Sequence, residues 1–149
     1  MASRWLITLL VCLGASLPAL AQDGGTVVGG GATITQPNAT TTRIDQATDR
    51  AIINWNNFSI GAGNSVIFNQ PGSNSVALNR VVGQNPSSIL GRLDANGQVF
   101  IVNPNGIVFG RGSQVNVGGL VASTLSITDS DFMAGRYHFK QDQIGRAHV

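Results

Sequence analysis

The stretch Gly97-Gln98-Val99-Phe100-Ile101-Val102-Asn103-Pro104-Asn105-Gly106-Ile107-Val108-Phe109-Gly110 decides the fold of this chain. Two runs of β-branched and aromatic residues flank the tetrapeptide Asn-Pro-Asn-Gly, so each run predicts a short strand and the tetrapeptide predicts the bend between them. The ring of Pro104 fixes φ for the first central position of a tight turn. Asn105 or Gly106 can then accept a positive φ at little steric cost. Because the flanking runs are almost wholly apolar, we expect both strands to be buried on both faces.

The rest of the chain repeats this pattern of brief apolar runs and polar turns. The runs with strand character cover residues 51–55, 58–60, 65–68, 75–78, 99–102, 107–109, 114–117 and 120–127. Clusters of Gly, Asn, Pro, Ser and Asp separate them, which indicates an all-β fold. A sandwich, a barrel and a β-solenoid all remain open on this count. Very short strands, runs that do not alternate cleanly, and Asn and Gly at the corners favour the solenoid.

Two segments are ambiguous between helix and strand. Within residues 44–55, Ile44, Ala51 and Trp55 also fit one face of a helix, but we favour two strands with a turn at residues 46–49. Leu90 and Leu93, on either side of a Gly-Arg pair, predict one short helical turn.

Residues 1–21 have the three parts of a secretory signal peptide. Arg4 supplies a positive start, residues 5–20 form an apolar stretch, and Ala19 and Ala21 make an A-x-A cleavage site before Gln22. A membrane anchor is the alternative, but the stretch is barely long enough to span a bilayer and small residues and a proline interrupt it. We therefore expect export by the Sec machinery. The one cysteine, Cys12, lies inside the signal, so the mature chain can form no internal disulfide.

The other end of the chain changes the charge argument. Residues 144–149 read Ile-Gly-Arg-Ala-His-Val and resemble the translation of a common sequencing-adapter sequence, so we expect the native sequence to be unfinished near Gln143. The formal charge of +2 comes from 9 basic and 7 acidic residues, and setting aside Arg4 in the signal and Arg146 in this tail leaves seven of each. The mature segment is neutral, so its charge gives no support for a nucleic-acid partner.

Residues 103–107, Asn-Pro-Asn-Gly-Ile, resemble the NPNGI signature of the two-partner secretion (TPS) domain of filamentous haemagglutinins, high-molecular-weight adhesins and haemolysins. Other segments resemble further family motifs in the same order. They are the N-W-x-x-F-x-I segment at residues 54–60, the apolar-N-R-V segment at 77–81, and the segments at 89–91, 96–100 and 122–125. A second family motif, NPNL, is replaced by Asn69-Gln70-Pro71-Gly72, which is typical of the adhesin and haemolysin subgroup.

The resemblance implies a right-handed parallel β-helix (β-solenoid) with an N-terminal cap, truncated at its C-terminus, over residues 22–143. It implies a TpsB-type outer-membrane β-barrel transporter with POTRA domains as the partner. It also implies export through the periplasm, followed by secretion or attachment to the outer cell surface. The domain would then direct a large adhesin- or haemolysin-type exoprotein to its transporter and nucleate β-helix folding at the cell surface. Contact with the host cell surface would belong to the missing C-terminal region.

The resemblance also supplies the candidate site residues. The candidate transporter-recognition or folding motif is Asn103, Pro104, Asn105, Gly106 and Ile107, with Asn79 and Arg80 as secondary candidates. Two interpretations of the first group stand side by side. Its asparagines cap a tight turn before a buried strand, or the turn helps to form the surface that the transporter engages. For the arginine, the alternative is that its stem shields an apolar strand.

Catalysis and metal binding find little support in the residue types present. The aspartates of interest are Asp45 with Asp49, Asp94 alone, and Asp129 with Asp131, and the chain has no glutamate. Glycan-cleaving enzymes on β-helices need clustered carboxylates, and a single native histidine, His138, cannot build a metal cluster or a triad. We predict no catalytic residues, no metal and no cofactor. A fragment of a secreted β-helical carbohydrate-active enzyme is the alternative, and an adhesin that binds through this segment itself is a third interpretation.

Overall fold

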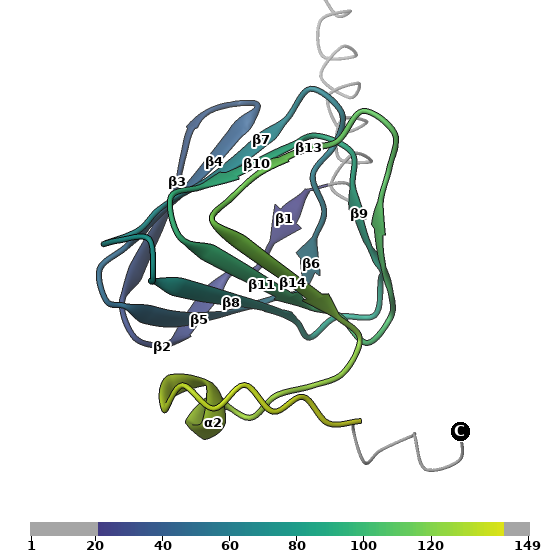
Figure 1. The fold of residues 1–149 in the computed structure, drawn as a ribbon. Coiled ribbons are helices and arrows are strands. Elements are labelled where there is room, and N and C mark those ends of the chain that lie inside the picture. Colours follow the sequence, from purple (N-terminus) through teal and green to yellow (C-terminus); the bar gives the residue numbers. More distant parts are fainter. Residues whose placement is uncertain (1–20, 142–149) are drawn as a thin grey trace, which may run out of the picture.

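The computed structural model describes residues 21–141, so almost all of the predicted signal peptide and all of residues 144–149 lie outside the described part. The chain winds into a three-walled solenoid (Figure 1). The first wall stacks in parallel β4 (Thr41–Gln46), β7 (Ser65–Asn69), β10 (Arg92–Ala95) and β13 (Gln114–Asn116). The second wall stacks β5 (Arg50–Trp55), β8 (Val76–Val81), β11 (Gln98–Val102) and β14 (Gly119–Ser123). The shorter third wall contains β6 (Asn57–Phe58), β9 (Ser87–Ile89) and β12 (Ile107–Phe109).

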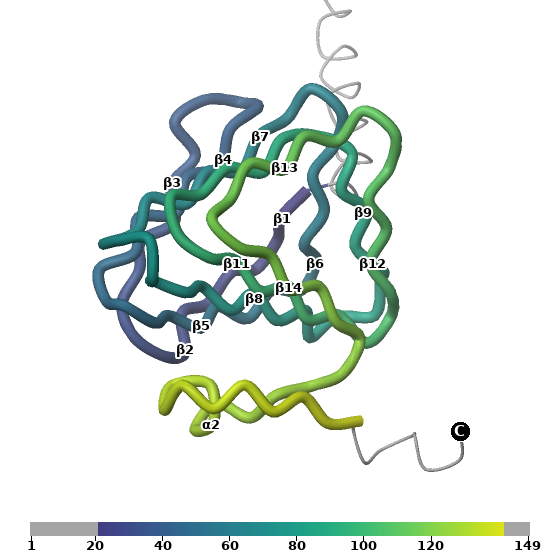
Figure 2. The backbone as a smooth tube through the Cα atoms, in the orientation of Figure 1, coloured from purple at the N-terminus to yellow at the C-terminus, as the bar shows by residue number. Residues whose placement is uncertain are grey.

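Each of the first three coils takes one strand from each wall, the fourth contributes β13 and β14, and the coils stack in strict register. In the first wall Ser65 pairs with Arg92 and Arg92 with Gln114, whereas in the third wall Ser87 pairs with Ile107. The spacing between stacked partners therefore differs from wall to wall and from coil to coil, which explains why the sequence shows no fixed repeat. The chain turns counter-clockwise as the coils approach the viewer, a right-handed path (Figures 1 and 2).

Antiparallel strands cap the N-terminal end of the solenoid. β1 (Gln22–Asp23) pairs with β6, β2 (Thr26–Gly29) with β5, and β3 (Ala32–Asn38) with β4. Ala32, Ile34 and Val27 of the cap pack beneath the core, so no apolar layer of the first coil is left open at this end. The predicted parallel β-helix with an N-terminal cap is confirmed.

Three strands of the second wall, β5, β8 and β11, are largely buried on both faces, and different clusters cover their two sides. Alternate residues point inward, where Ile53, Trp55 and Ile101 join the central core. Their neighbours point outward, where Leu78 and Phe100 join a second cluster that the C-terminal segment covers. The prediction that apolar and polar residues do not alternate cleanly along the strands is therefore correct. The cause is the second apolar cluster, which covers the outer face of this wall.

Three local predictions can be compared with the structure, and one element was missed. The two strands with a turn in residues 44–55 are confirmed as β4 and β5. The helical turn at Leu90 and Leu93 is wrong: β10 begins at Arg92, because two residues suffice to turn this corner. The burial predicted around the Asn-Pro-Asn-Gly bend holds for β11 but is wrong for β12, whose Val108 is 57% exposed. The short helix α2 (Asp129–Met133) was not predicted.

No helix among residues 21–141 is long and apolar enough to span a membrane.

Candidate functional site

The Asn-Pro-Asn-Gly segment forms the corner between the second and third walls. The N–H of Gly106 donates to the carbonyl of Asn103 at 3.1 Å, which closes a four-residue turn with Pro104 and Asn105 at its centre. Gly106 carries the positive φ, 112°, and no residue other than glycine has a positive φ in the described chain. Of the two residues expected to accept this conformation, it is therefore the glycine that does so.

Asn103 is fully buried and joins three coils. Its Nδ2 donates to the carbonyl of Asn85 at 3.0 Å and to Oγ of Ser87 at 2.9 Å, both in the preceding coil. Its Oδ1 accepts from the N–H of Asn105 at 2.9 Å, and its own N–H donates to the carbonyl of Ser123 at 3.0 Å in the next coil. Because every polar group of the side chain has a partner inside the corner, the folded protein presents none of them to an outside partner.

Further amides extend this corner toward the cap. Nδ2 of Asn85 donates to Oδ1 of Asn57 at 2.9 Å, and Nδ2 of Asn57 donates to Oδ2 of Asp23 at 3.3 Å. Nδ2 of Asn105 donates to the carbonyl of Gly83 at 3.0 Å. We call the set Asp23, Asn57, Asn85, Asn103 and Asn105 the corner ladder. It runs from β1 to the third coil.

The exposed part of the motif is small. Pro104 and Asn105 lie on the surface, whereas Ile107 is half-buried against the central core. Val108 and Phe109 follow on β12 and are 57% and 38% exposed, and this strand pairs only with β9 among the described strands. A partner could therefore touch the turn through its two central residues and the apolar residues of β12.

Asn79 and Arg80 are adjacent on β8 and point to opposite faces. Asn79 is fully buried, where its Oδ1 accepts from Nε1 of Trp55 at 2.9 Å and its Nδ2 donates to the carbonyl of Phe100 at 3.3 Å. Arg80 points outward and pairs with Asp129 at 2.7 Å. Arg80 is also the register partner of the residue before Asn103, so both candidate groups lie at one end of β8 and β11, with separate side-chain partners.

A second amide cluster was missed by the sequence reasoning. Gln70 is buried, its Nε2 donates to Oε1 of Gln46 at 3.1 Å, and its Oε1 accepts from the N–H of Gly97 at 2.8 Å. Asn96 exchanges two further hydrogen bonds with the backbone of Gln70, at 2.7 and 2.8 Å. The available signal was positional: a glutamine ends or directly follows a strand just before a turn in two successive coils.

The carboxylates considered for catalysis are dispersed, and most are held by arginines. Asp94 pairs with Arg92 at 2.6 Å, and Asp131 pairs with Arg136 at 3.1 Å. Hydrogen bonds from Asn69 and then from Arg43 lower the pKa of Asp45 below its ordinary value. No group of three or more His, Cys, Asp or Glu side chains gathers within residues 21–141.

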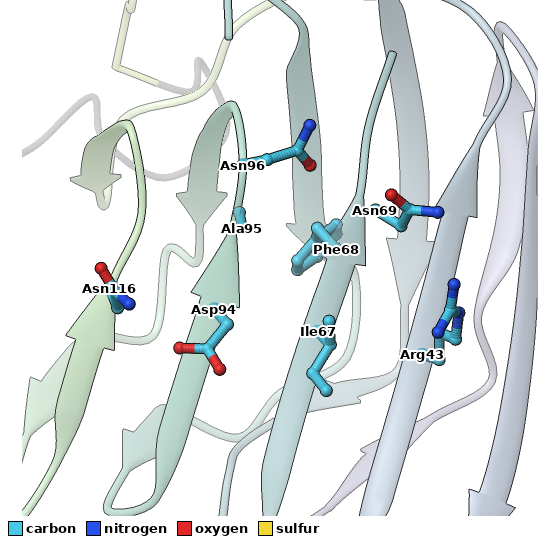
Figure 3. Close-up of a pocket in the computed structure, with 8 residues that line it drawn as sticks. All are labelled: Arg43, Ile67, Phe68, Asn69, Asp94, Ala95, Asn96 and Asn116. Carbon is cyan, nitrogen blue, oxygen red and sulfur yellow. The ribbon is translucent and has the colours of Figure 1, made fainter. Parts of the chain in front are cut away.

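An open recess of about 500 Å³ lies on the outer face of the first wall (Figure 3). Its lining residues are Arg43, Ile67, Phe68, Asn69, Asp94, Ala95, Asn96 and Asn116. Asp94 is the one carboxylate in this lining, so the recess does not bring together the acid and base that glycoside cleavage needs.

The fold and the corner define a class of protein: a capped β-solenoid in which the Asn-Pro-Asn-Gly turn is hydrogen-bonded to the coils before and after it. Residues 19–148 match the family model of the TPS secretion domain, and the chain belongs to this family. The resemblance found in the sequence is therefore confirmed. The match is to a secretion-domain family and gives no support to the carbohydrate-active enzyme.

Relatives and a solved structure agree with this assignment. The chain is 41% identical over 137 residues to a heme/hemopexin-binding protein of Haemophilus influenzae, covering 90% of this chain and 15% of that protein. It is 46% identical over 110 residues to the protein of the same name from strain ATCC 51907 / DSM 11121 / KW20 / Rd, covering 74% of this chain and 12% of the relative. The crystal structure of the HMW1 secretion domain from Haemophilus influenzae superposes with a TM-score of 0.78 at 41% identity, covering 83% of this chain and 32% of that one.

Proposed function

We propose that this secretion domain delivers a longer exported protein to a cognate TpsB-type outer-membrane transporter with POTRA domains. The family match carries the proposal, together with the length of the relatives, of which this chain spans 12–15%. The work is vectorial: extended segments pair edge to edge with the periplasmic domains of the transporter, and the β-helix then grows coil on coil outside the cell.

Within this function, Asn103 to Ile107 act chiefly by building the corner. The burial of Asn103 and its bonds to the coils before and after support a folding role over direct docking of its side chain. A coil that cannot close this corner cannot support the next one, because each coil buries its core against its neighbour. Asn79 acts in the same way from inside the coil, between Trp55 and the backbone of Phe100.

The decisive experiment compares two substitutions in the motif, with the exported protein co-expressed with its cognate transporter. Asn103→Ala is expected to lower the secreted amount at equal expression, because it removes the corner contacts. Pro104→Ala is the matched variant, since Pro104 is exposed and its side chain makes no hydrogen bond. Loss of secretion with Pro104→Ala, and not with Asn103→Ala, would replace the folding role by direct docking. Unchanged export of both variants would remove the motif from the mechanism.

The route begins in the periplasm, after export by the Sec machinery and cleavage of residues 1–21 by a signal peptidase. The A-x-A pattern at Ala19 and Ala21 supports cleavage before Gln22, the first residue of β1. Mass spectrometry of the exported chain is expected to find Gln22 as its first residue. An intact N-terminus on the exported chain would exclude this cleavage.

The cargo function of the whole protein belongs outside this domain. The chain is 41% identical both to a heme/hemopexin-binding protein and to the HMW1 secretion domain. This similarity therefore does not tell which activity the rest of the exported protein has. The name of the first relative nevertheless supports the proposal that the longer protein captures heme or hemopexin at the cell surface. Retention of the full-length exoprotein, and not of residues 22–141 alone, on immobilised hemopexin would support it. Binding to host cells or glycans by residues 22–141 alone would instead support an adhesin that acts through this segment.

A further inference from the structure

After β14 the chain leaves the solenoid and runs back across the outer face of the second wall. We call residues 124–141 the strap; it contains α2 and a short antiparallel bridge between Ser126 and Lys140. Figures 1 and 2 show it lying alongside the second wall, outside the coils.

Both ends of the strap are held by arginines of the second wall. At the start, Arg80 of β8 donates to the carbonyl of Ile127 at 2.8 Å and pairs with Asp129 at 2.7 Å. Near the other end, Nε of Arg50 donates to the hydroxyl of Tyr137 at 3.0 Å, and its guanidinium carbon lies 5.9 Å from the centre of the tyrosine ring. Arg50 belongs to the first coil, so the strap reaches back over the whole stack.

Aromatic side chains fill the space between these two anchors. Phe132 of α2 is fully buried, and the ring of Phe100 on β11 lies 5.8 Å from it. The same Phe100 ring lies 5.0 Å from Tyr137 and 6.0 Å from Phe139, centre to centre. Ile52 and Leu78 from the two earlier coils complete the cluster, so the strap rests on three coils at once.

This arrangement departs from the ordinary energetics of a solenoid. When each coil touches only its neighbours, stability is a sum of local terms and the ends open independently. We propose that the strap is a latch that couples the first of the four described coils to the fourth and makes these coils one cooperative unit. Because its contact sites come from three successive coils, the latch can close only after those coils have formed. The inference goes beyond the secretion function and does not depend on it.

Hydrogen exchange of the purified chain, measured by mass spectrometry, tests the latch because it reports the opening of coils that lie outside the strap. Tyr137→Phe keeps the ring and removes only the bond to Arg50, and Asp129→Asn removes the ion pair with Arg80. Each is expected to speed exchange about threefold to tenfold in β5 and also in β13 and β14. Asp131→Asn is the matched control, because the carboxylate of Asp131 pairs with Arg136 inside the strap.

Two results would overturn the latch. One is faster exchange confined to residues 124–141 in the Tyr137→Phe and Asp129→Asn variants. The other is an equal effect of Asp131→Asn on the coils. Urea unfolding adds a second reading, since Trp55, the one tryptophan in the described residues, reports on the first coil. In the unsubstituted chain, the urea concentration at which the Trp55 signal changes is expected to match the one at which β14 loses its protection from hydrogen exchange. In Tyr137→Phe the two transitions are expected to separate. Matching transitions in both proteins would contradict the coupling.

Discussion

Asn103 shows how one side chain can make a turn motif necessary to a fold. The oxygen of this buried amide accepts two hydrogen bonds from Asn105, and its nitrogen donates to Asn85 and Ser87, which fixes the turn to the preceding coil. Substitution empties a fully buried site and leaves the buried hydroxyl of Ser87 without this donor, and this cost exceeds the value of the bond itself.

We therefore expect Asn103→Ala to lower the free energy of unfolding by about 2 kcal/mol. Urea unfolding of the purified chain measures this. Asn103→Asp is an informative companion, because it keeps the acceptor for Asn105 but removes both donated bonds and buries a charge, so it should be at least as damaging. An aspartate variant as stable as the unsubstituted chain would show that the donated bonds contribute little.

Gly83 tests how closely the coils approach one another at the same corner. A Cβ at this position would lie 2.1 Å from the carbonyl oxygen of Asn56, a backbone atom that cannot move alone. We expect Gly83→Ala to destabilise the chain by about 1–3 kcal/mol. Gly72→Ala is the control, since nothing lies within 4 Å of the added carbon and φ is not positive there, so it should be neutral or slightly stabilising. Thermal unfolding of the two variants distinguishes close approach from a general intolerance of alanine at turns.

At the scale of elements, the sequence predicted what depends on local pattern. The Asn-Pro-Asn-Gly bend, the two strands around residues 46–49 and the all-β class follow from turn chemistry and strand-forming residues. The helical turn at Leu90 was wrong because Leu-Gly-Arg carries no signal for how tightly a solenoid corner turns. Helix α2 had a usable signal: Oγ1 of Thr128 accepts from the N–H of Asp131, three residues on, as an N-cap does.

The exposure of strands could not be read from the same pattern. β11 and β12 are similarly apolar in sequence, yet only β11 is covered on its outer face, by the strap. That cover comes from residues far along the chain, and no local rule links the two segments. The cluster of the buried Gln46 and Gln70 was missed for the same reason, since these side chains meet each other and the N–H of Gly97 across successive coils.

This difference between the two strands gives a prediction. Phe100→Ala is expected to lower the free energy of unfolding by about 3 kcal/mol, because the ring contacts three aromatic side chains of the strap. Val108→Ala on β12 should change it by less than about 0.5 kcal/mol, since Val108 is 57% exposed. Denaturant unfolding of both variants makes the comparison, and similar losses in the two strands would show that the outer face of β11 is not a packed interface.

At the scale of the molecule, growth and closure are separate steps. In the proposed order of folding, growth runs from the capped end, where β1, β2 and β3 cover the first coil, and adds parallel strands to each wall in turn. Closure then joins residues far apart in sequence, such as Arg50 and Tyr137. A chain that passes the outer membrane from its N-terminus would grow first and close last.

Secretion and final stability should therefore respond differently to substitution. Tyr137→Phe and Asp129→Asn weaken the strap, which closes after the coils have formed, so we expect normal secreted amounts with the transporter co-expressed. The released protein should then be cut about threefold to tenfold faster by protease, because the open form is more populated. Asn103→Ala acts during growth and should lower the secreted amount itself. The measurement is the amount of exported protein in the medium, followed by limited proteolysis of that same material. A fall in export for the strap variants in proportion to their lost stability would mean that the strap closes before the protein is released, and closure would then be part of secretion.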